Sequence, residues 1–407
     1  MIEARKAIEA LRAGVPNGAA VVALGTHLGS LSTLFLERLE ERESLDGDSP
    51  GLVISGDFGS GKSHALGYFR ELALARDYAA SVVTISKETP LFDPLRLYEA
   101  TIRATVVPRQ NDDIMTLVVA ALRAAGSAST FLGAPLGELE PALSPIFSAV
   151  LHVASSNKLG AEDVAAIARF FATGRLSKAR LSGWLRTTGS RRLFDIQMPK
   201  GADLASQLFR LAPRLIRAAG YRAWVILLDE VELLARYSSL QRGRSYAELG
   251  RLLAQDGSTG VLTVAAITGD FCDVVFGRRK DDEVLRARMG LRLNPQQAAW
   301  MDGAIAHLDR QATRLRPPSH DDLLRTQADI AALYTKAYRF EPALGPIGER
   351  LADRSFRQYI KGWITRWDLA RLYGATDLHM DVGTVAASLD ESPDFEAPPE
   401  DSPPEEE

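Results

Sequence analysis

The stretch GDFGSGKSHALG, residues 56–67, decides the fold class, because three glycines, a lysine and two serines fall within its first eight residues. The pattern G-x-x-x-x-G-K-[ST], which is typical of a phosphate-binding P-loop, is satisfied by Gly56, Gly61, Lys62 and Ser63. Glycine reaches positive φ without a Cβ clash, so backbone N–H groups can turn toward phosphate. Lys62 can then reach the β and γ phosphates, and the Ser63 hydroxyl can ligate Mg²⁺. We expect ATP and Mg²⁺ to be bound by Gly56, Asp57, Phe58, Gly59, Ser60, Gly61, Lys62, Ser63 and His64.

The segments around this loop predict an α/β fold. The loop follows a short apolar run at residues 52–55, and the apolar residues after it repeat at helical spacing. Most of the apolar runs are continuous, as in strands that are buried on both faces of a parallel sheet. The further runs lie at 81–86, 223–230 and 261–268, with a weaker one at 291–295. The sequence therefore predicts a P-loop NTPase of the additional-strand type.

Helical patterns outside these runs predict the remaining organisation. About 135 residues between the second and third runs contain helical patterns but no convincing strand. We expect an N-terminal helical segment at 1–50 and an ATPase core at 51–295 with a helical insertion at about 105–205. A C-terminal helical lid is expected at 296–388, followed by a disordered acidic tail at 389–407.

Composition and charge limit the classes of protein to which the chain can belong. The net charge is −4, but residues 390–407 hold nine acidic and no basic residues, so the rest of the chain carries +5. Cys272 is the single cysteine, which rules out an internal disulfide, and the six histidines have no paired ligand spacing. No apolar run is long enough to span a membrane, and the charged N-terminus has no signal-peptide core. We expect a cytoplasmic protein without a membrane contact.

The run at 223–230 supplies a second part of the predicted site. It ends in Asp229 and Glu230, and adjacent acids at the end of an apolar strand are typical of a Walker B element. Asp229 would hold Mg²⁺ and Glu230 would polarise the attacking water, whereas the alternative is a solvated strand end. Thr268, which ends the next run, is the best candidate for a residue that senses the γ phosphate, ahead of Asp270. A β-branched residue that simply ends a strand is the alternative for Thr268.

Two arginine-rich segments offer the positive charge that phosphoryl transfer usually needs. The segment after Thr268 contains Arg278, Arg279, Arg286 and Arg288, of which Arg286 and Arg288 are the leading candidates for an arginine finger reaching a neighbouring subunit. The alternative is a set of solvated helix charges. Near the start of a later predicted helix, Arg357 is a candidate lid arginine facing the nucleotide, ahead of Arg354.

Four segments of the sequence resemble one family, the P-loop ATPases of BREX phage exclusion of the BrxC/BrxD type. They are ALRAGVPNGAAVVALG, GDFGSGKSHALGYF, SKETPLFDPLRLYEA and VILLDEVELLARYSSLQRGRSYAELGRLL, and the resemblance covers most of residues 1–295. It implies an AAA+, origin-recognition-like fold, in which the segment before the P-loop packs on adenine; here this is Val15, Pro16 and Asn17. The family would have an arginine where this chain has Gly18. The resemblance further implies antiviral defence beside helicase, methyltransferase or phosphatase-like partners.

Three functions remain open from the sequence. The leading hypothesis is a Mg²⁺-dependent ATPase, active as a homo-oligomer, whose hydrolysis drives a conformational cycle in a DNA-associated assembly. The second is a regulatory switch that binds ATP and ADP, hydrolyses ATP slowly and recruits partners without contact with DNA. A nucleotide or small-molecule kinase is the third, and the acidic pair 229–230 argues against it. Basic stretches at 186–194 and 277–280 permit DNA binding, but no helix-turn-helix or zinc-finger pattern is present.

Overall fold

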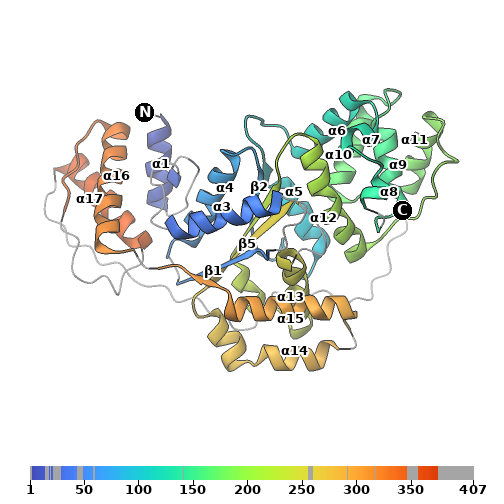
Figure 1. Cartoon of the computed structure of the whole chain (residues 1–407). Helices are drawn as coiled ribbons and strands as arrows, with labels where there is room; N and C mark the ends of the chain where they lie inside the picture. Colours follow the sequence, from blue (N-terminus) through green and yellow to red (C-terminus); the bar gives the residue numbers. More distant parts are fainter. Residues whose placement is uncertain are drawn as a thin grey trace.

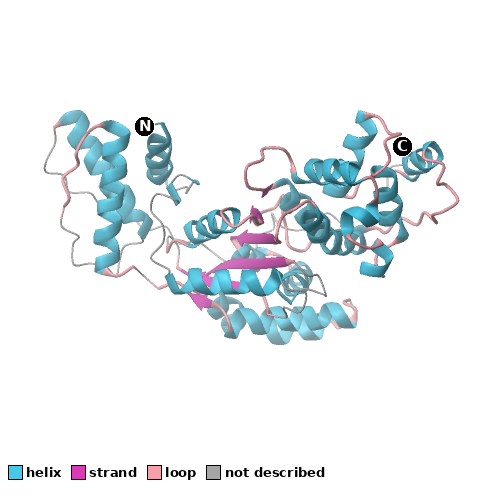
Figure 2. Ribbon diagram, turned by 45° about the horizontal axis from the view of Figure 1, so that its top comes forward, coloured by secondary structure: helices cyan, strands magenta, loops and turns pink. Residues whose placement is uncertain are grey.

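A single sheet lies at the centre of the computed structural model, which describes residues 2–13, 18, 20–21, 29–43, 49–57, 60–140, 142–254, 260–290, 292–316, 318–345 and 356–374. Within these residues six strands form the sheet in the order β3-β2-β4-β5-β1-β6. All neighbours are parallel except β3, which pairs antiparallel with β2 at the edge (Figure 2). The strands are β1 (Leu52–Gly56), β2 (Ala79–Thr84), β3 (Thr105–Val106), β4 (Trp224–Asp229), β5 (Val261–Thr268) and β6 (Thr313–Arg314). The prediction of an α/β fold is confirmed.

The four stronger apolar runs are confirmed as strands β1, β2, β4 and β5, but the predicted strand at 291–295 is wrong. Residues 292–293 form a turn, and the Asn294 side chain accepts a hydrogen bond from the backbone N–H of Gln297 in a capping box. The pattern S/T/D/N-x-x-E/Q is a helix start, and Pro295 is well placed at the first helical position. The helix that begins there is α15 (Pro295–Arg310).

Helices cover both faces of the sheet (Figure 1). On one face, α4 (Lys62–Leu74) packs on β4 and α3 (Gly29–Glu43) packs on β5, in an apolar cluster that includes Val225 and Leu227. On the other, α12 (Gly201–Ala218) packs on a cluster that includes Trp224, Ile226 and Leu228. Successive residues of β4 thus point alternately into two apolar layers, which explains why the run is apolar throughout.

Helices fill the segment between the second and fourth strands, and they lie together at the upper right of Figure 1. They include α5 (Pro94–Arg103), α6 (Ile114–Ala125), α7 (Ala128–Leu132), α8 (Leu136–Leu139), α9 (Pro145–Ala154), α10 (Ala161–Thr173) and α11 (Lys178–Thr187). Among the described residues no single helix is long and apolar enough to cross a bilayer, while one bent pair, 114–125 with 128–139, meets that test by length and composition.

The region after β4 contains a 3₁₀ segment, η1 (Val231–Arg236), then α13 (Ser239–Ala254), a π-helical segment, η2 (Asp273–Arg278), and α14 (Asp281–Met289). Helix α15 packs along α13 beneath the sheet. The chain then pairs β6 with β1 before it enters α16 (His320–Tyr338) and α17 (Phe356–Tyr373).

The N-terminal helix α1 (Ile2–Ala13) packs with α16 and α17, although more than 300 residues separate them along the chain (Figure 1). Ile8 and Leu11 share an apolar cluster with Tyr334 and Trp367. At its edge, Arg12 forms an ion pair with Asp368 at 2.7 Å. The segment that leads into the P-loop therefore begins in the same bundle as the C-terminal helices.

Candidate functional site

The carboxyl ends of four parallel strands form the edge where the predicted site residues meet. Gly56, the last residue of β1, lies in register with Thr268, the last residue of β5. On the other side, Asp229 of β4 lies in register with Thr84 of β2. In open α/β sheets ligands bind outside the carboxyl ends of the strands, so we expect a ligand site at this edge.

The P-loop leads from β1 into the N-terminus of α4. Gly61 adopts φ +100° and precedes the first helical residue, Lys62. A Cβ added at Gly56 would lie 2.5 Å from the Ser60 Oγ, so the turn needs a bare backbone at that position. Phe58 and Gly59 lie outside the described residues. The resulting helix start aims its backbone N–H groups and the positive end of its dipole at the sheet edge.

Lys62 is buried within this turn, with 8% of its surface exposed. Its Nζ donates to the carbonyl of Gly56 at 2.8 Å and to that of Asp57 at 3.4 Å. The ammonium is thus held over the end of β1 by neutral acceptors, which leaves its charge available to an anion.

The neighbouring loop residues supply hydroxyl and imidazole groups. Ser60 Oγ is buried and has no hydrogen-bond partner among the residues that the structure describes, and Ser63 and His64 are half-buried in the first turn of α4. A buried hydroxyl without a partner is unfavourable unless a ligand or water satisfies it. The loop is therefore arranged to receive a polar ligand.

Asp229 and Glu230 stand at the end of β4. Asp229 is buried, and its Oδ1 accepts a hydrogen bond from the backbone N–H of Glu230 at 3.0 Å. Glu230 adopts φ +56°, a left-handed conformation that is uncommon for a residue other than glycine and that clusters at functional sites. Desolvation by the surrounding protein, and then the charge of Asp229, raise the pKa of Glu230. A raised pKa increases the basicity of this carboxylate.

Three positively charged side chains oppose the rise in the pKa of Glu230. The charges of Lys62, Arg236 and Arg357 each lower the pKa of Glu230. Arg357 stands in the first turn of α17, so the C-terminal bundle brings one arginine into the electrostatic environment of the sheet edge. Arg236, at the end of η1, was not anticipated from the sequence. Arg354, the weaker candidate, lies outside the described residues.

Glu232 is a third carboxylate that the sequence analysis missed. It lies in η1 with 7% of its surface exposed, and its Oε2 has no hydrogen-bond partner within the described part of the chain. Burial raises the pKa of Glu232 to about 7, and the charge of Lys62 partly opposes that shift. The sequence DEVE carried a signal, because a third acidic residue lies only two positions beyond Glu230.

We expect this buried carboxyl to make stability depend on pH in the nucleotide-free protein. The pKa of Glu232 is higher in the folded than in the unfolded chain, so the folded state binds more protons between about pH 4.5 and 7, and stability falls as pH rises through that window. Glu232→Gln removes the cost of ionisation and should raise the free energy of unfolding near pH 8 by about 1–3 kcal/mol, with little change near pH 5.

Urea denaturation at several pH values measures this difference. Glu162→Gln, at a position with 94% of the side chain exposed, is the matched control and should follow the wild type. If Glu232→Gln keeps the wild-type dependence of stability on pH, Glu232 does not titrate in this range.

Thr268 ends β5 beside the P-loop. It is buried, and none of the described residues forms a hydrogen bond with its Oγ1. The next residue, Gly269, lies against Asp57, because a Cβ there would come within 2.3 Å of the Asp57 Oδ1. Asp270 is exposed. Of the two polar residues proposed for this strand end, Thr268 is thus the one that holds an unsatisfied donor at the edge.

The two proposed finger arginines lie on α14, at the bottom of Figure 1. Arg286 donates to Asp302 of α15 at 2.7 Å, and Arg288 donates to Ser239 at 3.1 Å; both side chains are exposed. Neither is among the charges that shift the pKa of Glu230. Of their neighbours, Arg278 is exposed, and Arg279 donates to the carbonyl of Ala235.

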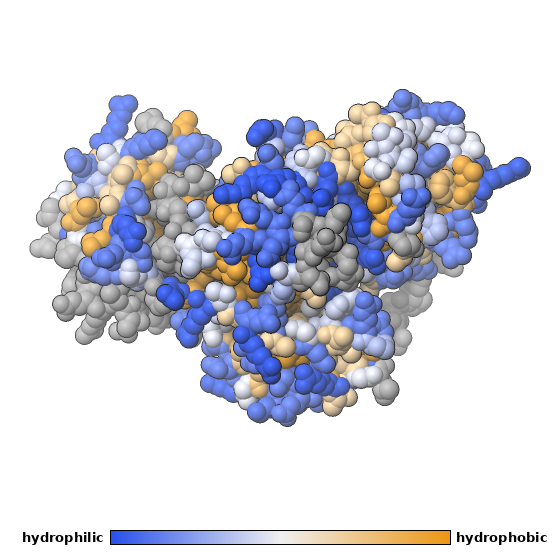
Figure 3. All heavy atoms as spheres, viewed as in Figure 1, coloured by the Kyte–Doolittle hydropathy of each residue, from blue (hydrophilic) through white to orange (hydrophobic). Residues whose placement is uncertain are grey.

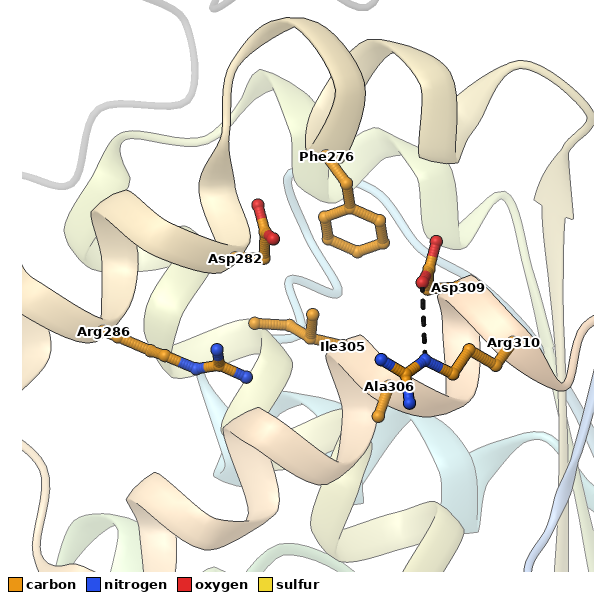
Figure 4. Close-up of a pocket in the computed structure, with 7 residues that line it drawn as sticks. All are labelled: Phe276, Asp282, Arg286, Ile305, Ala306, Asp309 and Arg310. Carbon is orange, nitrogen blue, oxygen red and sulfur yellow. Dashed lines mark ion pairs between the residues drawn. The ribbon is translucent and has the colours of Figure 1, made fainter.

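A small pocket lies beside Arg286, which reaches it from the side opposite Arg310 (Figure 4). Its volume of about 160 Å³ is below the ~300–1,000 Å³ typical of small-molecule sites. The pocket is therefore too small to be a second nucleotide site. Its lining residues are Phe276, Asp282, Arg286, Ile305, Ala306, Asp309 and Arg310.

The proposed adenine contacts, Val15, Pro16 and Asn17, lie outside the described residues. Gly18 is described, and a Cβ added to it would lie 3.1 Å from both the Arg70 guanidinium and the Glu71 carboxylate of α4. The chain therefore passes close to the helix that begins with Lys62. Close packing also explains why glycine suits this position, where the resemblance would have placed an arginine.

Comparison with protein families found one match. Residues 2–124 and 174–368 match the family described as BREX system ATP-binding protein BrxC/D. Comparisons with curated proteins and with solved structures found no significant match. The matched ranges contain the P-loop, the end of β4, Thr268 and the start of α17, whereas residues 125–173, within the helical region, lie outside the match.

Proposed function

The chain belongs to the family of BREX system ATP-binding proteins BrxC/D, and from this premise we propose that it is a Mg²⁺-dependent ATPase. Family membership makes it an ATP-binding component of a phage-defence system. We propose further that ATP binding and hydrolysis drive a conformational change or assembly on DNA with helicase, methyltransferase or phosphatase-like partners of that system.

One observation carries this proposal: Lys62 and two acidic residues, Asp229 and Glu230, share one edge of the sheet, with electrostatic coupling between Lys62 and Glu230. The strand order supports a P-loop NTPase of the additional-strand, AAA+ type, because β5 is interposed between β1 and β4. Thr268 then stands next to the loop, where a γ-phosphate sensor is needed.

The roles of the residues follow from their chemistry. The backbone N–H groups at the start of α4 and the Lys62 ammonium would bind the phosphates. Glu230, with its raised pKa, would accept a proton from the attacking water, and Thr268 Oγ1 would orient that water or the phosphate. Ser63 and Asp229 fit a Mg²⁺ site, since both offer oxygen ligands at this edge, and the ion would supply charge neutralisation of the phosphates.

Phosphate release from ATP tests the proposal. The purified chain should release phosphate in a Mg²⁺-dependent manner, and EDTA should abolish the release. Measurement with and without duplex DNA separates the motor from the regulatory switch, because only the motor is expected to turn over faster on DNA. Slow turnover that DNA does not change would favour the switch, and tight ATP binding with no turnover under either condition would reject the ATPase.

We also propose that the active form is an oligomer in which Arg286 or Arg288 completes the site of the adjacent subunit. Both arginines are exposed: Arg286 forms a surface ion pair with Asp302, and Arg288 donates one hydrogen bond to Ser239. Surface contacts of this kind contribute on the order of 0–1 kcal/mol, so exchange for a phosphate of a neighbour costs little. Such an arginine stabilises the charge of the transferring phosphoryl group.

Mixing two inactive variants tests this arrangement. Lys62→Ala and Arg288→Ala, each inactive alone, should regain partial ATPase activity together, because some interfaces then join an intact loop to an intact arginine. Arg325→Ala, which removes an exposed arginine of α16, is the control and should keep its activity when measured alone. A fully active monomer, or normal turnover in an Arg286→Ala/Arg288→Ala double variant, would contradict the proposal.

A further inference from the structure

We propose that an exposed basic face at α11, formed by Lys178, Ser182, Arg186, Arg191 and Arg192, binds the sugar-phosphate backbone of duplex DNA. The assignment rests on the proposed contact with DNA and gives it a location. The face lies in the helical region far from the P-loop, at the right-hand end of the molecule in Figure 1. Figure 3 shows hydrophilic residues projecting from that end.

The charge of this segment is strongly one-sided. Residues 175–200 contain seven basic residues and a single acid, Asp195. Two of the seven are neutralised, because Arg175 pairs with Glu99 and Arg180 pairs with Glu162 and Asp163.

The basic residues of the face differ from these paired arginines. Within the part of the chain that the structure describes, Lys178, Arg186, Arg191 and Arg192 form no ion pair, and all four are exposed. Arg186 makes only a hydrogen bond from its Nε to the carbonyl of Ser182 at 3.2 Å. Four neighbouring cations without carboxylate partners repel one another, and phosphates would relieve that repulsion.

The shape of α11 suits a close approach of a polyanion. Its apolar side, with Leu181, Trp184 and Leu185, is buried. Lys178, Ser182 and Arg186 follow one another at intervals of four, which places them in one row along the helix. The row spans roughly 12 Å at 1.5 Å per residue.

Small residues lie beside this row. A Cβ built at Gly183 has no atom within 4 Å, so the surface there is open, and Ala179 is exposed. Between Lys178 and Arg186 the exposed side of α11 carries no bulky side chain. A phosphate backbone can therefore approach the helix closely.

The turn that carries Arg191 and Arg192 is fixed by its own contacts. Gly189 adopts φ +77°, and the backbone N–H of Ser190 donates to the carbonyl of Leu185 at 2.7 Å. The Ser190 hydroxyl is buried and lies 2.6 Å from the Nε2 of His152 on α9. The two arginines therefore project from an anchored turn at the end of the basic row, and less conformational entropy is lost when they bind.

The chemistry of the face favours duplex DNA over other anionic partners. Hydroxyls and cations are the groups that contact phosphate and sugar, and arginine binds phosphate in a bidentate manner. Trp184 is buried, so the face offers no aromatic ring of α11 for the base stacking that single strands use. An acidic peptide is the competing partner, and the chain holds one of its own at residues 390–407.

Binding of a fluorescent duplex of about 20 base pairs, roughly two helical turns, to the full chain with ATP and Mg²⁺ tests the proposal. The variant Lys178→Ala/Arg186→Ala/Arg191→Ala/Arg192→Ala should bind at least about tenfold more weakly near 0.1 M salt. The slope of log K against log salt should fall by up to about 3.5, since each phosphate contact contributes about 0.9. The basal ATPase rate without DNA should stay unchanged and serves as the test of folding.

The control variant removes the same charges elsewhere: Arg103→Ala/Arg292→Ala/Lys336→Ala/Arg339→Ala, all at exposed positions. It should keep the affinity and the salt slope of the wild type. Wild-type DNA affinity in the α11 variant would reject the surface while leaving the proposed DNA contact intact. No DNA binding by the wild type would reject both, and the ATPase assay would still stand alone.

A synthetic peptide of residues 390–407 provides the arm for the competing partner. If the α11 substitutions abolish binding of this peptide but leave DNA binding unchanged, the face is a docking site for an acidic segment and the proposal is wrong. If the peptide competes with the duplex and both contacts weaken in the α11 variant, the face binds DNA and the tail mimics it.

Discussion

Lys62→Ala is expected to lower the affinity for ATP by about two orders of magnitude or more, because hydrogen bonds to charged groups are worth roughly 1.5–3 kcal/mol each. The ammonium is buried and held by the carbonyls of Gly56 and Asp57, and no carboxylate of the described residues lies within ion-pair distance of it. Its removal leaves the phosphate charge with only the backbone N–H groups of the loop. Calorimetric titration with ATP and Mg²⁺ measures the change.

The control for this prediction is Lys158→Ala, which removes an exposed lysine outside the sheet edge. It should bind ATP like the wild type. Because Lys62 also contributes two hydrogen bonds to the loop, the melting temperature of the Lys62→Ala variant must be compared without nucleotide. A folded Lys62→Ala variant that binds ATP with unchanged affinity would remove the loop from the proposed site.

Glu230→Gln is expected to keep ATP binding and to lower turnover by about 10²–10⁴-fold, the usual contribution of a general base. The amide retains the shape of the side chain but cannot accept the proton of the attacking water. The hydrogen bond from the Glu230 backbone N–H to the Asp229 Oδ1 is kept in this variant, because the substitution changes only the side chain. Asp229 should therefore keep its position. The variant should therefore lose ATP turnover while its affinity for ATP stays unchanged.

Phosphate release under saturating ATP, together with a binding titration, measures both quantities. Glu283→Gln, at an exposed position on α14, is the matched control and should turn over normally. Wild-type turnover in the Glu230→Gln variant would exclude Glu230 as the base and direct attention to Glu232. Loss of binding in that variant would instead assign Glu230 to the ligand pocket.

The strands that surround the site could be predicted because their signals are local. The runs that became β1, β2, β4 and β5 are mostly apolar on both faces, which is typical of strands that are covered on both faces. The strands that the sequence missed or predicted wrongly are short or ambiguous segments. β3 and β6 have two residues each, too few for a pattern, and the segment 291–295 reads as a strand only until Asn294 is recognised as a helix cap.

The distant contributions to the site could not be predicted in the same way. The sequence placed Arg357 at the start of a helix, but its influence on Glu230 depends on how the C-terminal bundle packs. Arg236 and Glu232 lie within seven residues of Asp229, yet only the η1 turn decides that Arg236 and Lys62 act on the same carboxylate. Arg286 and Arg288 remain predictions that depend on a neighbouring subunit.

The sequence by itself determined the chemistry of the loop at residues 56–63 and of the pair 229–230. Adjacent residues act together wherever the chain runs, because covalent geometry fixes the spacing of their N–H groups and side chains. Only the tertiary structure decided which distant groups share their environment. Gly56 and Thr268 meet through a strand register, and α1 joins α16 and α17 through a buried apolar cluster. Burial is the largest cause that raises the pKa of Glu232 to about 7. Register, packing and desolvation are properties of the folded chain as a whole, since each depends on atoms that lie far apart in the sequence.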